Sequence, residues 1–440
     1  MNGGTTQLFY ASTLYGAATL AAAIDSGCFR PAERRVLLVS TNAAVPETTT
    51  PLHRMPGFER LRGRFDEVLD WNETIEPLHP GGWTPRPDDL PLLQRHLRRL
   101  WALGTDRVEL VVESLQVAPA LTIARLFPDA PIDVYADGLM SYGPTRNKID
   151  PLVGERVRRL LHLDLVPGLA PLLLAEFGAV AETVPTEAFT KVVEELSGPA
   201  PAEPAPEPGP ALLLGQYLAA LSLLTPEEEG ELHLRMVRGA VARGHRRLVF
   251  KPHPTAPDAW STALAREAEA LGAELTVLDR PVLAEVLYRE VRPALVVGCF
   301  STALFTASAF YGIEAARVGT RPLLARLSPY QNSNRVPLVL VDALIPGLEE
   351  PGRGPMELPH LESLVTAVGF AMQPRIRPDL RDAAVRHLSG PLAAPTRHHF
   401  TRRRLTSLGL PGGLPVPRHP GLRRLARRAL KLKRRALGGR

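Results

Sequence analysis

Short runs of consecutive apolar residues recur along the chain and alternate with segments whose apolar positions have helical spacing. Such runs are typical of β-strands buried on both faces, and their alternation with helices indicates parallel sheets. The runs lie at residues 7–13, 35–41, 108–114, 132–138, 211–217, 247–253, 274–280, 294–300 and 336–342. The pattern therefore predicts an α/β protein.

A proline-rich segment divides the runs into two groups. Residues 199–210, PAPAEPAPEPGP, hold proline at half of their positions and cannot continue a helix or a central strand. We therefore expect an N-terminal Rossmann-like domain in residues 1–198, a linker at 199–210, a C-terminal Rossmann-like domain in 211–375, and C-terminal helices with a basic tail in 376–440. Ligands of such folds bind beyond the carboxyl ends of the strands, so the residues after each run are candidates for a site between the domains.

The composition, with 45% hydrophobic and 22% charged residues, is that of a globular protein. The apolar stretch at the N-terminus has no basic leader and is interrupted by Ser, Thr, Tyr and Gly, so we expect neither a signal peptide nor a membrane span. Cys28 and Cys299 are the only cysteines, which is too few for a disulfide framework and lacks the spacing of a zinc site. We therefore expect a protein of the reducing cytoplasm.

The net charge of +6 conceals a strongly basic tail. Residues 397–440 contain fourteen Lys or Arg and no acid, so the rest of the chain sums to −8. Residues 419–440 place Leu and Ala at helical spacing opposite a dense Arg/Lys face, which suits peripheral attachment to the anionic inner face of a membrane. A solvated or disordered basic end is the alternative. Nucleic acid is an unlikely partner, because residues 401–440 hold no aromatic residue for base stacking.

One acid, Asp137, directly follows the strand-like run IDVYA and precedes Gly138. This places a carboxylate at a strand end, where a glycine permits a tight turn and the close approach of another group. Such an acid can be a general base, and an Asx-turn or a helix cap is the structural alternative. Neither half contains a GxGxxG or GxxxxGK[ST] loop, which disfavours a classical dinucleotide or P-loop enzyme.

Two further clusters follow strand-like runs of the second group. The segment KPHP, residues 251–254, holds His253 rigidly between prolines, as suits a proton donor or a phosphate contact. A histidine in an ordinary turn and a solvated Lys251 are the alternatives. Ser301 and Thr302 precede an apolar helix, so their hydroxyls and the N–H groups of the helix start can bind an anion, although an ordinary N-cap explains the same residues. Together the three clusters indicate a transferase that holds a phosphate in one domain and the attacking hydroxyl near the other.

The three clusters resemble motifs of bacterial sialyltransferases, and most closely those of the alpha-2,8-polysialyltransferase family. Those enzymes share an acid-acid-Gly motif, a His-Pro motif and a Ser/Ser or Ser/Thr motif, in this order. The matching residues here are Ala136-Asp137-Gly138, His253-Pro254 and Ser301-Thr302. The likeness spans roughly residues 5–330, and it departs from the pattern at Ala136, where the first acid would stand.

This resemblance implies a GT-B fold and an inverting transferase that uses neither a cofactor nor an essential metal. The donor would be CMP-sialic acid or a related CMP-nonulosonic acid, and the acceptor a glycan hydroxyl, for a surface polysaccharide. Asp137 would deprotonate that hydroxyl, because an alcohol is a poor nucleophile at neutral pH. His253 would protonate or hydrogen-bond the departing CMP phosphate, and Ser301 and Thr302 would stabilise its charge.

Three more residues are weaker candidates for the same cleft. Glu285 lies between the His-Pro and Ser/Thr motifs, where related enzymes often keep an acid for the ribose hydroxyls, and a surface-helix glutamate is its alternative. Gln216 and Lys251 follow strand-like runs of the second domain. Two other functions stay open: a GT-B transferase or epimerase that uses another sugar nucleotide, and a non-catalytic scaffold that binds a membrane surface or nucleic acid.

Overall fold

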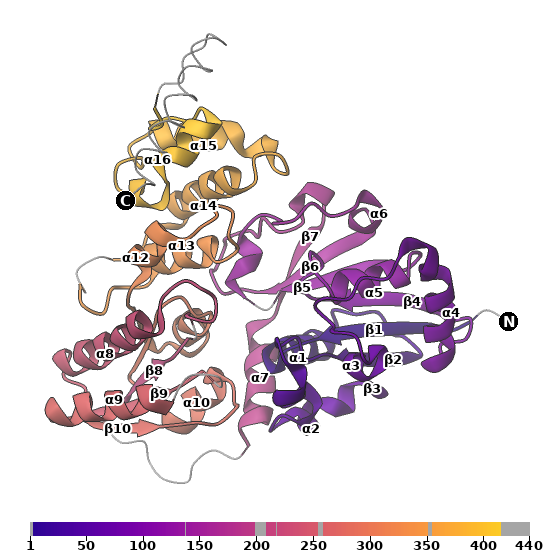
Figure 1. The fold of residues 1–440 in the computed structure, drawn as a ribbon, viewed down its shortest axis with the longest axis horizontal. Coiled ribbons are helices and arrows are strands. Elements are labelled where there is room, and N and C mark those ends of the chain that lie inside the picture. Colours follow the sequence, from indigo (N-terminus) through magenta and orange to yellow (C-terminus); the bar gives the residue numbers. More distant parts are fainter. Residues whose placement is uncertain are drawn as a thin grey trace, which may run out of the picture.

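Two parallel β-sheets, one on each side of the proline-rich segment, form the framework of the computed structural model (Figure 1). The structure describes residues 3–136, 138–198, 208–216, 218–253, 258–350 and 354–414. Within these residues the first sheet has seven strands in the order β3-β2-β1-β4-β5-β6-β7, and the second has five in the order β10-β9-β8-β11-β12. The strands of the first sheet are β1 (Thr5–Ala11), β2 (Arg34–Val39), β3 (Glu67–Asp70), β4 (Arg107–Val112), β5 (Ile132–Ala136), β6 (Val157–Leu163) and β7 (Val180–Val184). Those of the second are β8 (Ala211–Leu214), β9 (Arg247–Lys251), β10 (Glu274–Val277), β11 (Leu295–Gly298) and β12 (Glu314–Arg317).

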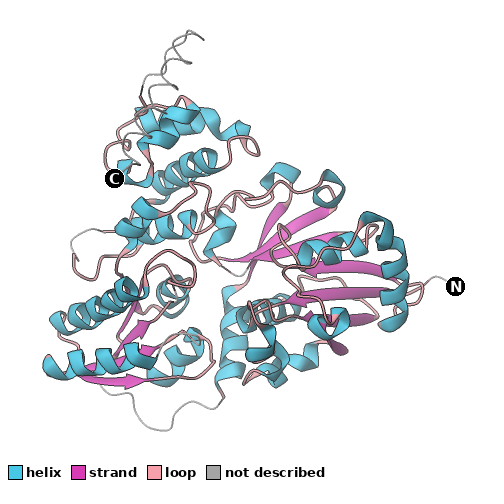
Figure 2. Cartoon of the chain, in the orientation of Figure 1, coloured by secondary structure: helices cyan, strands magenta, loops and turns pink. Residues whose placement is uncertain are grey.

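Helices surround the sheets, and both faces of the first sheet are buried (Figure 2). Along β1, Leu8 and Tyr10 pack into one apolar cluster, whereas Phe9 and Ala11 pack into another, because successive side chains of a strand point to opposite faces. The helices of the first half are α1 (Leu14–Asp25), α2 (Phe58–Leu61), α3 (Trp71–Ile75), α4 (Leu90–Leu100), α5 (Ala120–Leu126), α6 (Pro151–Gly154) and α7 (Thr186–Ser197). Those that follow are α8 (Pro226–Ala242), α9 (Asp258–Ala270), α10 (Ala284–Val291), α11 (Ala303–Phe305), α12 (Thr320–Arg326), α13 (Arg335–Leu344), α14 (Leu358–Met372), α15 (Arg381–Ser389) and α16 (Arg402–Leu408).

Eight of the nine predicted strands exist, and the ninth prediction is wrong. The run at 336–342 lies inside helix α13, whose residues from Arg335 to Ala343 are all buried. A helix buried on every side shows the same unbroken apolar run as a buried strand, so the pattern alone cannot separate them. Pro337 is compatible with this helix because it stands in the first turn, where a backbone N–H has no partner within the helix.

Four strands were not predicted, because polar residues interrupt their apolar pattern. Strands β3, β7 and β12 lie at sheet edges, where exposed positions carry polar side chains. Strand β6 contains Arg158 and Arg159, whose guanidinium groups each lie 2.9 Å from a different carboxylate oxygen of the buried Asp133. This pairing compensates the charge of a carboxylate that is 1% exposed.

The two sheets repeat one topology. In each, the first strand pairs with the second on one side and the fourth on the other, in the order 3-2-1-4-5 that is typical of Rossmann-like folds. Two Rossmann-like domains that face each other across a cleft are the GT-B arrangement, and this prediction of the fold is confirmed. The first sheet ends at β7 and the second begins at β8, whereas residues 199–207 of the expected linker lie outside the described residues.

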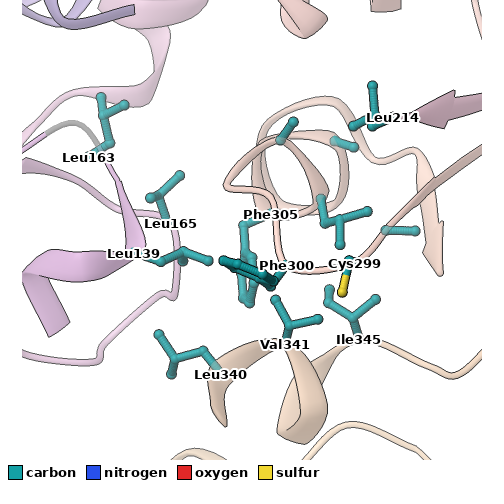
Figure 3. Close-up of a cluster of buried hydrophobic side chains, with 14 of the residues drawn as sticks. Leu139, Leu163, Leu165, Leu214, Cys299, Phe300, Phe305, Leu340, Val341 and Ile345 are labelled. Atoms are coloured by element: carbon teal, nitrogen blue, oxygen red, sulfur yellow. The ribbon is translucent and has the colours of Figure 1, made fainter. Parts of the chain in front are cut away.

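An apolar interface joins the two halves beside the cleft. Figure 3 shows Leu139 and Leu165 of the first half next to Phe300 and Phe305 of the second. Farther along the interface, helix α7 packs against α10, and the guanidinium of Arg289 lies 2.5 Å from the carboxylate of Glu194. The halves therefore share part of one continuous core.

The C-terminal helices pack beside α13 and return to the first half (Figure 1). A Cβ at Gly369 of α14 would stand 2.7 Å from Leu172, and the amide of Gln373 donates to the carbonyl of Arg146 at 2.5 Å. The basic tail from residue 415 lies outside the described residues. Within the part of the chain that the structure describes, no helix combines the length and the apolar composition needed to cross a bilayer.

Candidate active site

A cleft of about 620 Å³ lies between the carboxyl ends of the two sheets, where open α/β folds bind their ligands. Both halves contribute to its walls, so a ligand can contact the two domains at once. Among its lining residues are Thr13, Glu113, Ser114, Tyr135, Ala136 and Gly138 from the first half, and Gln216, Lys251, Glu285, Phe300, Ser301 and Thr302 from the second.

The turn after β11 lines the cleft on the side of the second half. The backbone N–H of Phe300 donates to Gln216 Oε1 at 2.9 Å, which ties this turn to the residue that follows β8. Next, Ser301 Oγ accepts from the N–H of Ala303 at 3.2 Å, and Thr302 is the N-cap residue of α11. The two hydroxyls thus lie at a helix start and also line the cleft, and the binding of an anion there stays a prediction.

Glu285 lies at the start of α10 and is only 2% exposed, so it is not a surface-helix glutamate. Its Oε1 accepts a hydrogen bond from Thr306 Oγ1 at 2.6 Å. Burial raises the pKa of Glu285, and the Thr306 hydrogen bond and the Lys251 charge oppose that shift. The side chain therefore lines the cleft as a buried acceptor of hydrogen bonds.

Lys251 and His253 lie at the end of β9 but differ in their access to the cleft. Lys251 lines it, and burial lowers the pKa of its ammonium, against the charges of Glu285 and Asp279. His253 is exposed as a residue and is not among the lining residues. Partial burial of its ring and the nearby Lys251 charge lower the pKa of His253. The catalytic role of His253 stays a prediction.

Asp137 lies outside the described residues, and its role stays a prediction. Its neighbours in the sequence, Ala136 and Gly138, both line the cleft. A Cβ at Gly138 would stand 2.9 Å from Thr302 Oγ1, so the two halves of the cleft touch where the acid and the Ser/Thr motifs meet. Only glycine allows this approach without a shift.

A carboxylate in the first half was missed by the sequence analysis. Glu113 is 7% exposed and lines the cleft directly after β4. Its Oε2 accepts from the hydroxyl of Tyr135 at 2.9 Å, and its Oε1 accepts from Ser12 Oγ. The signal was present, because the run VELVVES ends in Glu113-Ser114 and the rule that selected Asp137 applies equally to it.

Outside the cleft, one cluster within the described residues has donor atoms close enough for a metal ion. It consists of Asp342, His398 and His399, whose donor atoms lie within 4.8 Å of one another. Arg317 Nη2 and Arg321 Nε, however, lie 3.0 and 3.6 Å from Asp342 Oδ1. Although burial opposes it, the His398 hydrogen bond and the neighbouring positive charges hold the pKa of Asp342 well below its usual range. The carboxylate is thus already compensated, and an ion-pair cluster explains it better than a metal centre.

The comparison with family models agrees with the family resemblance of the sequence. The model of the family described as alpha-2,8-polysialyltransferase (POLYST) matches residues 7–320. No curated protein matches the chain.

Three solved structures are distantly similar, all with TM-scores below 0.5, and the family assignment does not depend on them. An O-GlcNAc transferase variant from Thermobaculum terrenum shares 16% identity at a TM-score of 0.38, over 90% of this chain and 66% of that one. MurG from Acinetobacter baumannii shares 13% at 0.39, and a glycosyltransferase from Rickettsia africae shares 11% at 0.38, each over 90% of this chain and 97% of the other. The family match covers most of the sequence, so this chain belongs to the alpha-2,8-polysialyltransferase family of glycosyltransferases.

Proposed function

We propose that the protein transfers sialic acid or a related nonulosonic acid from a CMP-activated donor to a glycan hydroxyl, with inversion and without a metal ion. The observation that carries the proposal is the contact between two motifs of the family. Gly138, which follows Asp137, approaches Thr302 Oγ1 so closely that a Cβ would stand 2.9 Å away. A sugar held in the cleft beside this contact would lie within reach of both motifs.

The second half of the cleft suits the phosphate of CMP. Ser301 and Thr302 offer hydroxyls at a helix start, and Lys251 adds a positive charge from the end of β9, on the other side of β8. These groups would stabilise the negative charge that develops on the phosphate as the bond to the sugar breaks. Glu285, a buried acceptor on the same wall, would bind the ribose hydroxyls.

The reaction requires one proton to leave the acceptor and one to reach the departing group. Asp137 would take the proton of the acceptor hydroxyl while its oxygen forms the new bond to the anomeric carbon and the bond to the phosphate breaks. His253 would supply a proton to the departing CMP phosphate. Its lowered pKa makes the imidazolium a stronger acid but leaves less of it protonated at neutral pH, so this transfer is favoured at mildly acidic pH.

The basic tail would keep the enzyme near a membrane-linked acceptor. Residues 397–440 hold fourteen cations and no acid, and each cation close to an anionic surface adds about 1 kcal/mol of binding. A surface glycan built on the inner face of the membrane is the product class that this attachment serves. Deletion of residues 417–440 should abolish binding to liposomes that contain phosphatidylserine, and unchanged binding would refute the attachment.

The first test measures CMP release from CMP-sialic acid, with and without glycan acceptors. Replacement of Asp137 by Ala should lower acceptor-dependent release by about 10²- to 10⁴-fold, because it removes the general base. Asp129→Ala is the matched control, since Asp129 is an exposed acid in the loop before the same strand. CMP, and not UDP, should raise the melting temperature of both variants. Protection by UDP alone would indicate another sugar nucleotide, and no release or protection with either would refute the transferase.

A further inference from the structure

Each sheet has a crevice at the point where its strand order reverses, between β1 and β4 in the first sheet and between β8 and β11 in the second. Ligands of such sheets bind at this point. In the second sheet the turn after β11 carries Ser301 and Thr302, and helix α10 carries Glu285. The function proposed above assigns the hydroxyl pair to the phosphate of CMP and the acid to its ribose. Because phosphate and ribose are covalently joined, the protein must hold these groups at a fixed separation.

Thr306 connects the two groups, although it is fully buried and is not among the described residues that line the cleft. Its backbone N–H donates to the carbonyl of Thr302 at 3.2 Å. Its Oγ1 lies 2.6 Å from Glu285 Oε1 and 3.1 Å from the carbonyl oxygen of Ala303. In addition, the Tyr288 hydroxyl of α10 donates to the carbonyl of Ala303 at 2.7 Å. The segment from Thr302 to Thr306 is thus linked twice to α10 at the wall of the cleft.

The contact between Thr306 and Glu285 does not depend on whether the carboxyl carries a proton. An ionised carboxylate accepts a hydrogen bond from the threonine hydroxyl. A protonated carboxyl donates to the same hydroxyl oxygen, and Thr306 can then donate to the carbonyl of Ala303. In both states Glu285 Oε1 is held against Thr306, so the carboxyl keeps one orientation in the wall of the cleft.

The fold alone would not select a hydroxyl at this position. Residues 303–307 are all buried, and the chain passes there from α11 into a π-helical turn at Thr306–Phe310. Valine has nearly the same shape as threonine and would fill the same volume without burying a polar group. Turns of π-helix are also frequent at functional sites. The Thr306 hydroxyl therefore indicates a role in the crevice in addition to packing.

We propose that Thr306 is a positioning residue for the donor, which holds Glu285 at the separation from Ser301 and Thr302 that a ribonucleoside monophosphate requires. The proposal rests on the transferase function proposed above and concerns the recognition of the ribose. Replacement of Thr306 should therefore weaken the selection of ribose over deoxyribose, although Thr306 does not line the cleft. A residue that served packing alone would affect the stability of the protein and leave this selection unchanged.

The test measures the Kd values of CMP, 2′-deoxy-CMP and 3′-deoxy-CMP by calorimetry. The wild type should bind CMP at least about tenfold more tightly than one of the deoxynucleotides, because the missing hydroxyl leaves a buried carboxyl without its partner. Thr306→Val removes the hydroxyl at nearly constant shape. It should raise the Kd of CMP about fivefold, with little effect on the disfavoured deoxynucleotide. Thr306→Ser keeps the hydroxyl and should retain the preference of the wild type.

Thr320→Val is the matched control, because Thr320 is a fully buried threonine of the same half whose Oγ1 lies 3.2 Å from Asp342 Oδ1. Neither of these two residues is among the described residues that line the cleft. The control should lower the melting temperature and leave the nucleotide preference unchanged.

A wild type that binds CMP and both deoxynucleotides equally would overturn the proposal whether or not any variant folds. A folded Thr306→Val protein with the full preference of the wild type would overturn it as well. If the wild type binds no cytidine nucleotide at all, the proposed donor itself fails and this proposal fails with it. That result is distinguishable from both others, in which CMP binds.

Discussion

The two crevices of the cleft share a topology and differ in the groups that they present. The crevice between β8 and β11 offers the hydroxyls of Ser301 and Thr302 and, beside it, the Lys251 ammonium. The crevice between β1 and β4 offers the Glu113 carboxylate and the Tyr135 hydroxyl. The first set suits an anion, and the second suits hydroxyl groups that donate hydrogen bonds. One duplicated fold can thus divide a transfer reaction into a side that accepts negative charge and a side that binds the nucleophile.

The two crevices also differ in the hydrogen bonds that fix their lining residues. In the second half, the side chain of Gln216, after β8, accepts a hydrogen bond from the backbone N–H of Phe300, after the neighbouring strand β11. In the first half, the hydroxyls of Ser12 and Tyr135 each donate a hydrogen bond to the carboxylate of Glu113. A substitution of Gln216 should therefore act through the position of the turn after β11, whereas a substitution of Glu113 should act through the loss of its two hydrogen bonds.

The largest expected effect on the rate concerns the proton that His253 would transfer to the departing CMP phosphate. A general acid works in its protonated form, so the rate should fall as the pH rises through the pKa of His253. Because that pKa is lowered, the decline in kcat/KM should already begin below about pH 6.5. His253→Gln should lower kcat by about 10²-fold and remove this decline. A variant that keeps both the rate and the pH profile of the wild type would separate His253 from catalysis.

The second prediction tests the close contact between the two halves of the cleft with a substitution that makes this contact too tight. Gly138→Ala places a methyl group 2.9 Å from Thr302 Oγ1, so the halves must move apart where the acid and Ser/Thr motifs meet. We expect kcat to fall about tenfold, since small displacements of reacting groups are costly. Gly63→Ala is the control, because a Cβ there meets no atom within 4 Å. Equal kcat values for the two variants would show that the contact does not position the motifs.

The crevice between β8 and β11 was the easier one to locate from the sequence. Its residues follow strands that are buried on both faces and therefore have unbroken apolar runs, and ligands of such folds bind beyond the carboxyl ends of the strands. Gln216, Lys251, Ser301 and Thr302 all line the cleft, and their roles toward a donor stay predictions. The roles of Asp137 and His253 remain predictions.

Other features escaped the sequence for physical reasons. Helix α13 was mistaken for a strand because it is buried on all sides. Glu113 follows its strand as Asp137 does, so its place at a strand end was open to prediction, whereas its hydrogen bonds with Ser12 and Tyr135 form only in the folded chain. Sequence patterns record which residues end a strand, whereas the strand order that brings two such ends together is a property of the fold.

The smallest expected effect tests whether Gln216 supports CMP binding by holding the turn after β11 in position. Gln216→Ala leaves the Phe300 N–H without its partner, and Phe300 is 7% exposed. We expect the Kd of CMP to rise about fivefold, as for the loss of one neutral hydrogen bond, with the KM of the acceptor unchanged. Gln373→Ala removes a similar amide contact outside the cleft lining and should change neither constant. If Gln216→Ala instead raised only the acceptor KM, the assignment of the two crevices to donor and acceptor would have to be reversed.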